Sequence, residues 1–334
     1  MTGGDLTGLP VLVLGGSGFL GRHICAAFTA AGARVVRVRR TAHEEADSGC
    51  RTVALDLIEA PTRQLAQLCA RTQARVLVNA AGAVWEGTEQ RMTQLNTDLV
   101  GRLTEAVAAL PERPRLIQLG SAYEYGPAAP GVVIDETWPP APATVYGRTK
   151  LDGSQTVVRA ADASRVEAVV LRVSVACGPG APPTSLPGIV AAHLAAGRGE
   201  LRLSPLRAHR DLVDVRDVAE AVLAAARAPA AVLGGVVNVG SGEAVPVHRV
   251  VELMISLSGR RLSVVEEPTG REKRGDAQWQ CLDISRARRL LGWAPRRTLE
   301  DSLGDLLAAV GVPAVRLAGR QSEEAPEGRE KDGR

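Results

Sequence analysis

Residues 11–22 read Val-Leu-Val-Leu-Gly-Gly-Ser-Gly-Phe-Leu-Gly-Arg, so a short apolar run leads directly into a glycine-rich turn. Apolar residues with helical spacing follow in residues 24–31. Strand, turn and helix in this order are the context that a dinucleotide-binding site requires. The stretch therefore predicts the first strand and the first helix of a nucleotide-binding α/β domain.

The glycines of this turn, Gly15, Gly18 and Gly21, have the spacing Gly-x-x-Gly-x-x-Gly. Gly15 permits the tight turn, Gly18 lets the backbone approach a pyrophosphate, and Gly21 lets the helix pack closely on the strand. The helix N-terminus then offers free N–H groups to the phosphates. The alternative is a glycine-rich turn that binds no ligand. The residues of the turn that we expect to contact a cofactor are Gly15, Ser17, Gly18, Phe19, Leu20 and Gly21.

Composition narrows the class of protein. The 334 residues suffice for one large α/β domain or two smaller ones, and a hydrophobic content of 45% supplies an ample core. Aromatic residues make up only 3%, and the net charge of +3 comes from interspersed acids and bases. Both features argue against nucleic-acid partners. No signal peptide is evident and no apolar run reaches about 18 residues, so we expect a cytoplasmic protein without a membrane partner.

The five cysteines are odd in number, widely scattered and without a Cys-x-x-Cys pair. Reduced thiols fit this pattern better than a disulfide framework or a zinc site. The five histidines also lack metal-ligand spacing. We therefore expect no metal.

Short apolar runs alternate with stretches of helical periodicity along the chain. This alternation predicts an α/β fold, a Rossmann-type doubly wound parallel sheet with a smaller C-terminal substrate lobe. The expected strands after the first are 35–38, 52–55, 76–78, 116–119, 168–171 and 236–239. The expected helices after the first are 63–70, 89–110, 146–161, 215–226 and 247–257.

Proline and glycine become more frequent after about residue 176, and long irregular segments in α/β proteins often carry a ligand site. We therefore expect an NADP-binding domain over 1–176, to which the strand 236–239 returns. A discontinuous substrate-binding lobe should cover 177–315. The charged tail 316–334 lacks apolar anchors and should be disordered.

The end of the second expected strand indicates the cofactor. An NAD site places an acidic residue there, on the ribose 2′-hydroxyl, but this strand ends in Arg39 and Arg40. Guanidinium groups grip a 2′-phosphate, so we predict NADP(H). The alternative is a solvated strand end. Further cofactor contacts are expected from Asp56 and Leu57 on the adenine, and from Asn79, Ala80 and Ala81 near the nicotinamide half.

Tyr146 and Lys150 are four residues apart and share one face of a helix. Ser121 follows the fifth strand at its carboxyl end, where open α/β sheets bind ligands. These positions can converge on one substrate oxygen, with Tyr146 exchanging a proton and Ser121 donating a hydrogen bond. Lys150 would hold the nicotinamide ribose, and its positive charge would lower the pKa of Tyr146 from the ordinary value of about 10. Each lowering of that pKa by one unit requires about 1.4 kcal/mol. Reduction of a carbonyl group requires a smaller change in the Tyr146 pKa than proton abstraction does, because neutral tyrosine is already the proton donor.

The glycine turn, Ser121, Tyr146 and Lys150 together resemble the extended short-chain dehydrogenase/reductases, the NAD-dependent epimerase/dehydratase group. Further resemblances cover the chain to about residue 315. They lie at Leu95-Asn96-Thr97, at 142–146, at 210–219, at Asn238-Val239-Gly240-Ser241-Gly242 and at 283–293.

The resemblance implies a nucleotide-activated sugar as substrate, dTDP- or GDP-linked. It implies that Asn96 is a cofactor residue and that Arg210, helped by Lys273 or Arg274, contacts the sugar diphosphate. An ion pair of Arg210 with Asp211 or Asp214 is the alternative. It also implies a homodimer, in which the helices 89–110 and 146–161 pair into a four-helix bundle. The implied substrate residues are Ser121, Ala122, Tyr123, Val175, Arg210, Lys273 and Arg274.

The loop 120–126, Gly-Ser-Ala-Tyr-Glu-Tyr-Gly, narrows the reaction. Sugar dehydratases of this group carry an Asp-Glu pair where Ala122 and Tyr123 stand, and decarboxylases want a Glu at Tyr123. The loop is most similar to reductases of 4-keto-6-deoxy nucleotide sugars. The sequence departs from the family pattern at Val175, Leu212, Asp214 and Lys273.

We therefore predict NADPH-dependent reduction of a keto group, at C4, of a nucleotide-linked deoxysugar. A composition rich in Ala and Arg and poor in Lys suggests a bacterium of high GC content. Enzymes that the chain resembles often serve secondary-metabolite sugar synthesis in such bacteria, including that of antibiotics, and by this association we expect the same role. Three alternatives stay open: a nucleotide-sugar epimerase that retains its cofactor, a ketone or aldehyde reductase for a natural product, and a non-catalytic NADP-binding sensor.

Overall fold

A seven-stranded parallel sheet forms the centre of the computed structural model, with the strand order β10-β6-β5-β4-β1-β2-β3. The structure describes residues 5–41, 49–84, 87–267 and 278–315. The predicted Rossmann-type fold class is confirmed. The strands of this sheet are β1 (Pro10–Leu14), β2 (Arg34–Arg39), β3 (Arg51–Ala54), β4 (Val76–Asn79), β5 (Arg115–Ser121), β6 (Ala168–Val173) and β10 (Val236–Val239).

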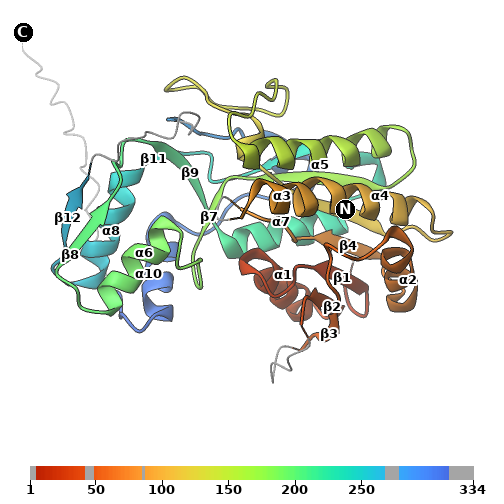
Figure 1. Ribbon diagram of the computed structural model, residues 1–334, viewed down its shortest axis with the longest axis horizontal. Helices are drawn as coiled ribbons and strands as arrows, with labels where there is room; N and C mark the ends of the chain where they lie inside the picture. Colours follow the sequence, from red (N-terminus) through yellow and green to blue (C-terminus); the bar gives the residue numbers. More distant parts are fainter. Residues whose placement is uncertain (1–4, 42–48, 85–86, 268–277, 316–334) are drawn as a thin grey trace, which may run out of the picture.

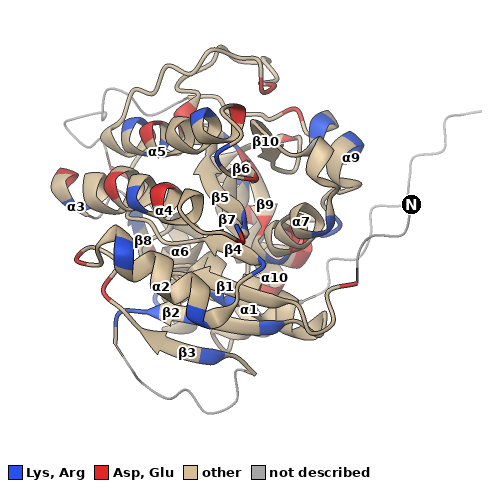
Figure 2. Ribbon diagram, turned by 90° about the vertical axis from the view of Figure 1, so that its right-hand side faces the viewer, with Lys and Arg blue, Asp and Glu red and all other residues tan. Residues whose placement is uncertain are grey.

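Two hydrophobic cores lie on the two faces of the sheet. Val11 and Val13 belong to one core and Leu12 and Leu14 to the other, because successive strand residues point to opposite faces. Figure 2 shows the two helical layers on either side of the strands. One layer holds α1 (Phe19–Ala30), α7 (Val215–Arg227) and α9 (Ser285–Leu291), and the other holds α2 (Thr62–Thr72), α4 (Leu99–Ala108) and α5 (Val145–Asp162).

The helix expected over 89–110 is interrupted. It consists of α3 (Glu89–Thr93), a π-helical turn (Gln94–Asp98) and α4. Asn96 lies in the π-helical turn and is 2% exposed. Such turns insert one extra residue into a helix and are frequent at functional sites. Periodicity alone does not reveal this local change of winding.

A second lobe stands beside the sheet (Figure 1). Its core contains Leu194, Met254 and Leu306 from three helices, and β7 and β9 contribute Cys177 and Leu212. Within the stretch 177–315, α7, β10 and α9 instead pack with the main sheet. The elements of the lobe and of its connecting sheet are α6 (Leu186–Ala195), α8 (Val247–Ser258), α10 (Leu299–Ala309), β7 (Val175–Cys177), β8 (Glu200–Leu203), β9 (His209–Asp214), β11 (Ala244–Pro246) and β12 (Ser263–Glu266).

Two short 3-10 helices complete the described elements, Ala122–Glu124 (η2) and Ala230–Val232 (η3). Among the described residues, no helix combines the length and the apolar character needed to cross a membrane. Within the same residues, no three His, Cys, Asp or Glu side chains gather so that they could hold a metal ion. The tail 316–334, predicted to be disordered, lies outside the described residues.

Candidate active site

The glycine-rich turn joins β1 to α1 as the sequence predicts. Gly15 has a φ of +71°, and a Cβ there would lie 2.7 Å from the Cα of Ala81. A Cβ on Gly21 would overlap the carbonyl oxygen of Gly15. Only glycine fits both positions. Because these two residues lack a Cβ, the first residues of α1 can pack closely against the carboxyl ends of β1 and β4.

A cavity of about 390 Å³ opens at this turn. It contains nine of the predicted cofactor residues. The residues that line it are Gly15, Ser17, Gly18, Val38, Arg39, Arg40, Thr41, Leu55, Asp56, Leu57, Ile58, Ala80, Ala81, Gly82, Arg91 and Leu95. Phe19, Leu20, Gly21, Asn79 and Asn96 are not among these lining residues. For all of the predicted cofactor residues, lining the cavity or not, direct contact with a cofactor stays a prediction.

The loop after β3 is held in a fixed shape. The Asp56 carboxylate accepts a hydrogen bond from the Ile58 amide at 2.9 Å. Arg102 of α4 donates to the carbonyls of Leu57 and Ile58, each at 2.9 Å. Arg91 of α3 was missed in the sequence analysis, although it adds a third arginine to the cavity wall. An arginine on a short helix, away from the carboxyl end of any strand, carries no recognisable signal in the sequence.

Asn79 and Asn96 shape the neighbouring loop after β4. The Asn79 amide donates to Gln118 at 2.8 Å and accepts from the Ala81 amide at 3.2 Å. The Asn96 side chain exchanges two hydrogen bonds with the Ala83 backbone, at 3.0 and 2.9 Å, and donates to Thr149 at 3.1 Å. Asn96 therefore ties the loop to α5 through its own side chain.

Ser121 and Tyr146 meet at the carboxyl end of β5. Ser121 is the last residue of β5 and caps the short helix η2, its hydroxyl accepting from the Tyr123 amide at 3.3 Å. Tyr146 is in the first turn of α5 and hydrogen-bonds to the Ser121 side chain. The Tyr123 ring stands nearly perpendicular to the Tyr146 ring, with centroids 5.8 Å apart.

The environment of Tyr146 keeps its phenol protonated. Burial raises the pKa of Tyr146 to about 12; the hydrogen bond with Ser121 works against this change and the charge of Glu124 adds to it. The expectation that Lys150 lowers this pKa stays a prediction, because Lys150 is not among the groups that shift the pKa of Tyr146 here.

Lys150 lies one helical turn after Tyr146 and is 7% exposed. Its Nζ donates a hydrogen bond to the carbonyl oxygen of Leu119 in β5. Burial lowers the pKa of Lys150, while the nearby Glu124 carboxylate works against that change. The structure thus brings Ser121, Tyr146 and Lys150 together near the carboxyl end of β5, as predicted from their spacing.

The predicted substrate residues differ from one another in burial and in their place in the fold. Ala122 is fully buried in a small core with Tyr125 and Ile134, so we assign it to the core and no longer to the substrate surface. Val175 is partly buried at the start of β7, opposite Leu212 of β9.

Arg210 is 8% exposed and donates to the neighbouring His209 carbonyl at 3.1 Å. The two carboxylates offered as its alternative partners are bonded to other groups. Asp211 accepts from the amides of Ser241 and Leu282, and Asp214 from Arg216. Lys273 and Arg274 lie outside the described residues.

Comparisons with known proteins agree with this geometry. The model of the NAD dependent epimerase/dehydratase family matches residues 11–240. The chain is 42% identical over 310 residues to dTDP-6-deoxy-L-talose 4-dehydrogenase (NAD(P)(+)) of Kitasatospora kifunensis, which covers 91% of this chain and 96% of the relative. It is 28% identical over 353 residues to dTDP-L-rhamnose 4-epimerase of Burkholderia thailandensis, covering 90% and 94%. Among solved structures, MoeE5 in complex with UDP-glucuronic acid and NAD has the same fold, with a TM-score of 0.81, 24% identity and coverage of 90% and 98%.

Proposed function

Because the chain belongs to the NAD-dependent epimerase/dehydratase family, we propose that it reduces the C4 keto group of a nucleotide-linked 6-deoxysugar with NADPH. The observation that carries this proposal is the Tyr146 phenol hydrogen-bonded to the Ser121 hydroxyl at the carboxyl end of β5. A phenol that stays protonated over the whole physiological range is suited to give a proton to a carbonyl oxygen.

The glycine turn and the cavity fit a dinucleotide. The Gly15 and Gly21 positions admit no Cβ, and the cavity wall carries cations where phosphates would lie. When bound, NADPH supplies the hydride that reaches the ketone carbon. Arg39 and Arg40 would hold its 2′-phosphate, and the N–H groups at the start of α1 would face its pyrophosphate.

The chain's own side chains then manage the proton. Ser121 donates a hydrogen bond to the ketone oxygen and polarises the carbonyl. Tyr146 transfers its phenolic proton to the forming alkoxide. The positive charge of Lys150 compensates the phenolate that remains and orients the ribose. Arg210 would contact the diphosphate of the sugar nucleotide, since paired phosphates favour guanidinium.

The relative at 42% identity supports a dTDP-linked 6-deoxysugar and chemistry at C4. The name of that relative describes the oxidative direction, and the same residues serve both directions. The proposed role is in deoxysugar synthesis for secondary metabolites such as antibiotics.

The direct test mixes the protein with NADPH and a dTDP-linked 4-keto-6-deoxysugar and follows the absorbance of the reduced cofactor. Parallel arms use NADH and the GDP-linked sugar. We expect oxidation of NADPH that depends on the sugar. An absence of oxidation with either sugar nucleotide and either cofactor would overturn the proposal.

Epimerisation at C4 is a second candidate, favoured by the relative that is a dTDP-L-rhamnose 4-epimerase. An epimerase retains its oxidised cofactor through both half-reactions, whereas a reductase exchanges it. Denaturing the purified protein and identifying any released dinucleotide separates the two. Tightly held NAD, together with interconversion of two sugar epimers without added cofactor, would favour the epimerase.

A further inference from the structure

Glu124, two residues beyond Ala122 in η2, has a fully buried side chain. One carboxylate oxygen accepts hydrogen bonds from the backbone amide of Ser121 and from the hydroxyl of Ser154, both at 2.8 Å. The other accepts from Nε of Arg172 in β6 at 2.7 Å. A single carboxylate therefore binds to β5, α5 and β6 at once.

Ser154 lies on the same face of α5 as Tyr146 and Lys150. Tyr146, Lys150 and Ser154 follow one another at intervals of four residues on α5, so they lie on one face of the helix. Ser154 is 1% exposed. Its hydrogen bond to Glu124 fixes this face of α5 against the Ser121 end of β5.

The strand makes room for the carboxylate. A Cβ on Gly120 would lie 2.7 Å from the Glu124 oxygen and 3.2 Å from the Ser154 hydroxyl oxygen. On the far side, the Arg172 guanidinium lies over the Tyr125 ring, 4.4 Å from its centroid. The Tyr125 hydroxyl donates to Asn238 of β10 at 2.7 Å. Both oxygens of the Glu124 carboxylate thus have hydrogen-bond donors.

We propose that Glu124 is a positioning residue that joins Ser121 to the Tyr146–Lys150 face of α5 and holds Tyr146 and Lys150 in their protonated forms. A buried negative charge stabilises an ammonium and destabilises a phenolate. Other polar groups that face Tyr146 and Lys150 include the hydroxyls of Ser121 and Tyr123 and the Leu119 carbonyl. Arg172 is paired with Glu124 itself.

The test uses lysine side-chain NMR, because the sequence contains only Lys150, Lys273 and Lys331. Protein made with isotope-labelled lysine gives three titrating signals, and Lys150→Arg identifies the one from Lys150. In Glu124→Gln we expect Lys150 to lose its proton about one pH unit lower than in the parent. An unchanged Lys150 titration in Glu124→Gln would overturn the electrostatic part of the inference.

Ser154→Ala separates position from charge. It removes one hydrogen bond from Glu124 and keeps the carboxylate. We expect an unchanged Lys150 titration and a fall in kcat of about 10-fold at constant KM, because small displacements of reacting groups are costly. Full kcat in Ser154→Ala would overturn the positioning part.

One further variant covers the case in which Glu124→Gln does not fold, and a second serves as a control. Glu124→Gln alone strands the buried Arg172 charge, so the double variant Glu124→Gln, Arg172→Gln repeats the titration if the single variant does not fold. Removing Arg172 also removes a positive charge, so the reference for the double variant is Arg172→Gln alone. Lys150 should deprotonate at lower pH in the double variant than in Arg172→Gln, and no difference between the two would count against the inference. Asp217→Asn is the matched control, since Asp217 is also a buried carboxylate with an arginine partner, Arg297 at 2.7 Å. It should leave the Lys150 titration in place.

The inference rests on the proposed function, because that proposal makes Tyr146 the proton donor and Lys150 the cation that compensates its phenolate. The NMR titration requires neither NADPH nor sugar. A parent protein that fails to reduce any ketosugar would therefore remove the proposed function, while the Lys150 titrations would still decide the electrostatic role of Glu124.

Discussion

At the scale of single residues, the site depends on which protonation state the surroundings favour. Tyr146 stays neutral because burial opposes a phenolate, and Lys150 is made more acidic by the same burial. The two effects act in opposite directions on the pKa because one group is charged when deprotonated and the other when protonated. Tyr146, partly buried and one helical turn from the buried Lys150, is therefore a proton donor before it is a base.

Tyr146→Phe removes the proton donor and keeps the ring. We expect turnover of the ketosugar to fall about 100- to 10,000-fold, while NADPH still binds, as measured by quenching of protein fluorescence. Substantial turnover in Tyr146→Phe with intact NADPH binding would exclude proton donation by Tyr146 and would favour the sensor alternative.

Arg39→Glu places a carboxylate where the 2′-phosphate should lie. We expect kcat/KM with NADPH to fall about 10- to 100-fold, because a charge-assisted hydrogen bond is lost and a repulsion is gained. The value with NADH should change little. Arg34→Ala, at the exposed start of the same strand, is the matched control and should alter neither value. Equal losses with both cofactors would exclude a 2′-phosphate contact for Arg39.

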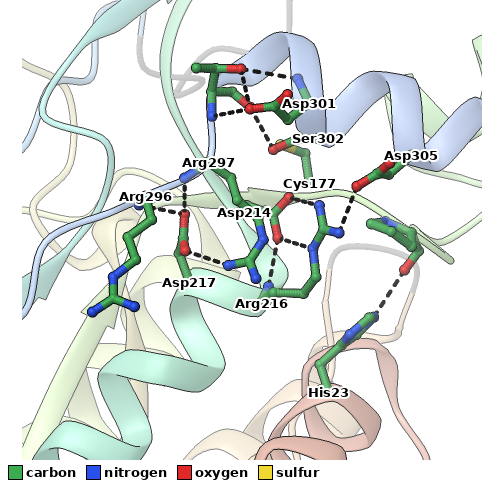
Figure 3. Close-up of polar contacts among 12 residues, drawn as sticks. His23, Cys177, Asp214, Arg216, Asp217, Arg296, Arg297, Asp301, Ser302 and Asp305 are labelled. Atoms are coloured by element: carbon green, nitrogen blue, oxygen red, sulfur yellow. Dashed lines mark hydrogen bonds and ion pairs between the residues drawn. The ribbon is translucent and has the colours of Figure 1, made fainter. Parts of the chain in front are cut away.

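At the scale of elements, the start of α7 joins the two lobes (Figure 3). Asp214 caps α7 by accepting from the Arg216 amide at 2.7 Å, and the Arg216 guanidinium bonds both Asp214 and Asp305 of α10. His23 of α1 meets the carbonyl of Pro179 at 3.0 Å. Asp214, at which the sequence departs from the family pattern, therefore has a structural role here.

Asp214→Asn tests this junction through its pH dependence. Burial tends to raise the Asp214 pKa, but hydrogen bonds from Arg216 and Ser302 outweigh it and the pKa is lowered. The ionised carboxylate thus stabilises the fold above the unfolded pKa of about 3.9, and this contribution is lost as the pH falls through the lower folded pKa.

At neutral pH we expect Asp214→Asn to unfold with a free energy lower by about 1 to 3 kcal/mol. Urea titrations of parent and variant should show this difference intact down to about pH 5 and shrinking below about pH 4. A difference that is constant over this range would show that Asp214 does not stabilise the fold through its charge.

At the scale of the whole molecule, the main sheet and the strands beside the second lobe supply different residues of the candidate site. The glycine turn, Ser121 and the Tyr146–Lys150 face of α5 lie at the carboxyl ends of the strands of the main sheet. Arg210 comes from β9, which pairs with β7 and β11 beside the lobe. Figure 1 shows the lobe standing at the end of the molecule away from β3. A substrate held between Arg210 and Tyr146 would therefore contact both parts.

The homodimer proposed through α4 and α5 has its own test. Gly101 lies in α4, and a Cβ there would meet nothing within 4 Å. Gly101→Arg should be tolerated within one subunit, and arginine is about 1 kcal/mol more favourable than glycine in a helix. Across a four-helix bundle it would bring charges into the interface. We expect sedimentation to show a dimeric parent and a monomeric Gly101→Arg.

Ala26→Arg, on an exposed position of α1 in the opposite helical layer, is the control and should remain a dimer. A monomeric parent, or a dimeric Gly101→Arg protein, would exclude this bundle as the interface.

The sequence by itself determined the doubly wound sheet and the residues of the central chemistry. Strand and helix periodicities are local properties, and the spacing of Tyr146 and Lys150 places them on one face of any helix that contains them. The glycine turn was equally readable, because a positive φ at Gly15 and the close approach at Gly21 exclude other residues.

Only the tertiary structure decided how these groups are held and charged. The π-helical turn at Asn96, the burial of Ala122 and the raised pKa of Tyr146 all depend on contacts between segments far apart in the chain. Glu124 shows the reason most clearly. Its partners come from β5, α5 and β6, and no local pattern records that one carboxylate will meet all three, because burial and long-range hydrogen bonds exist only once the chain has folded.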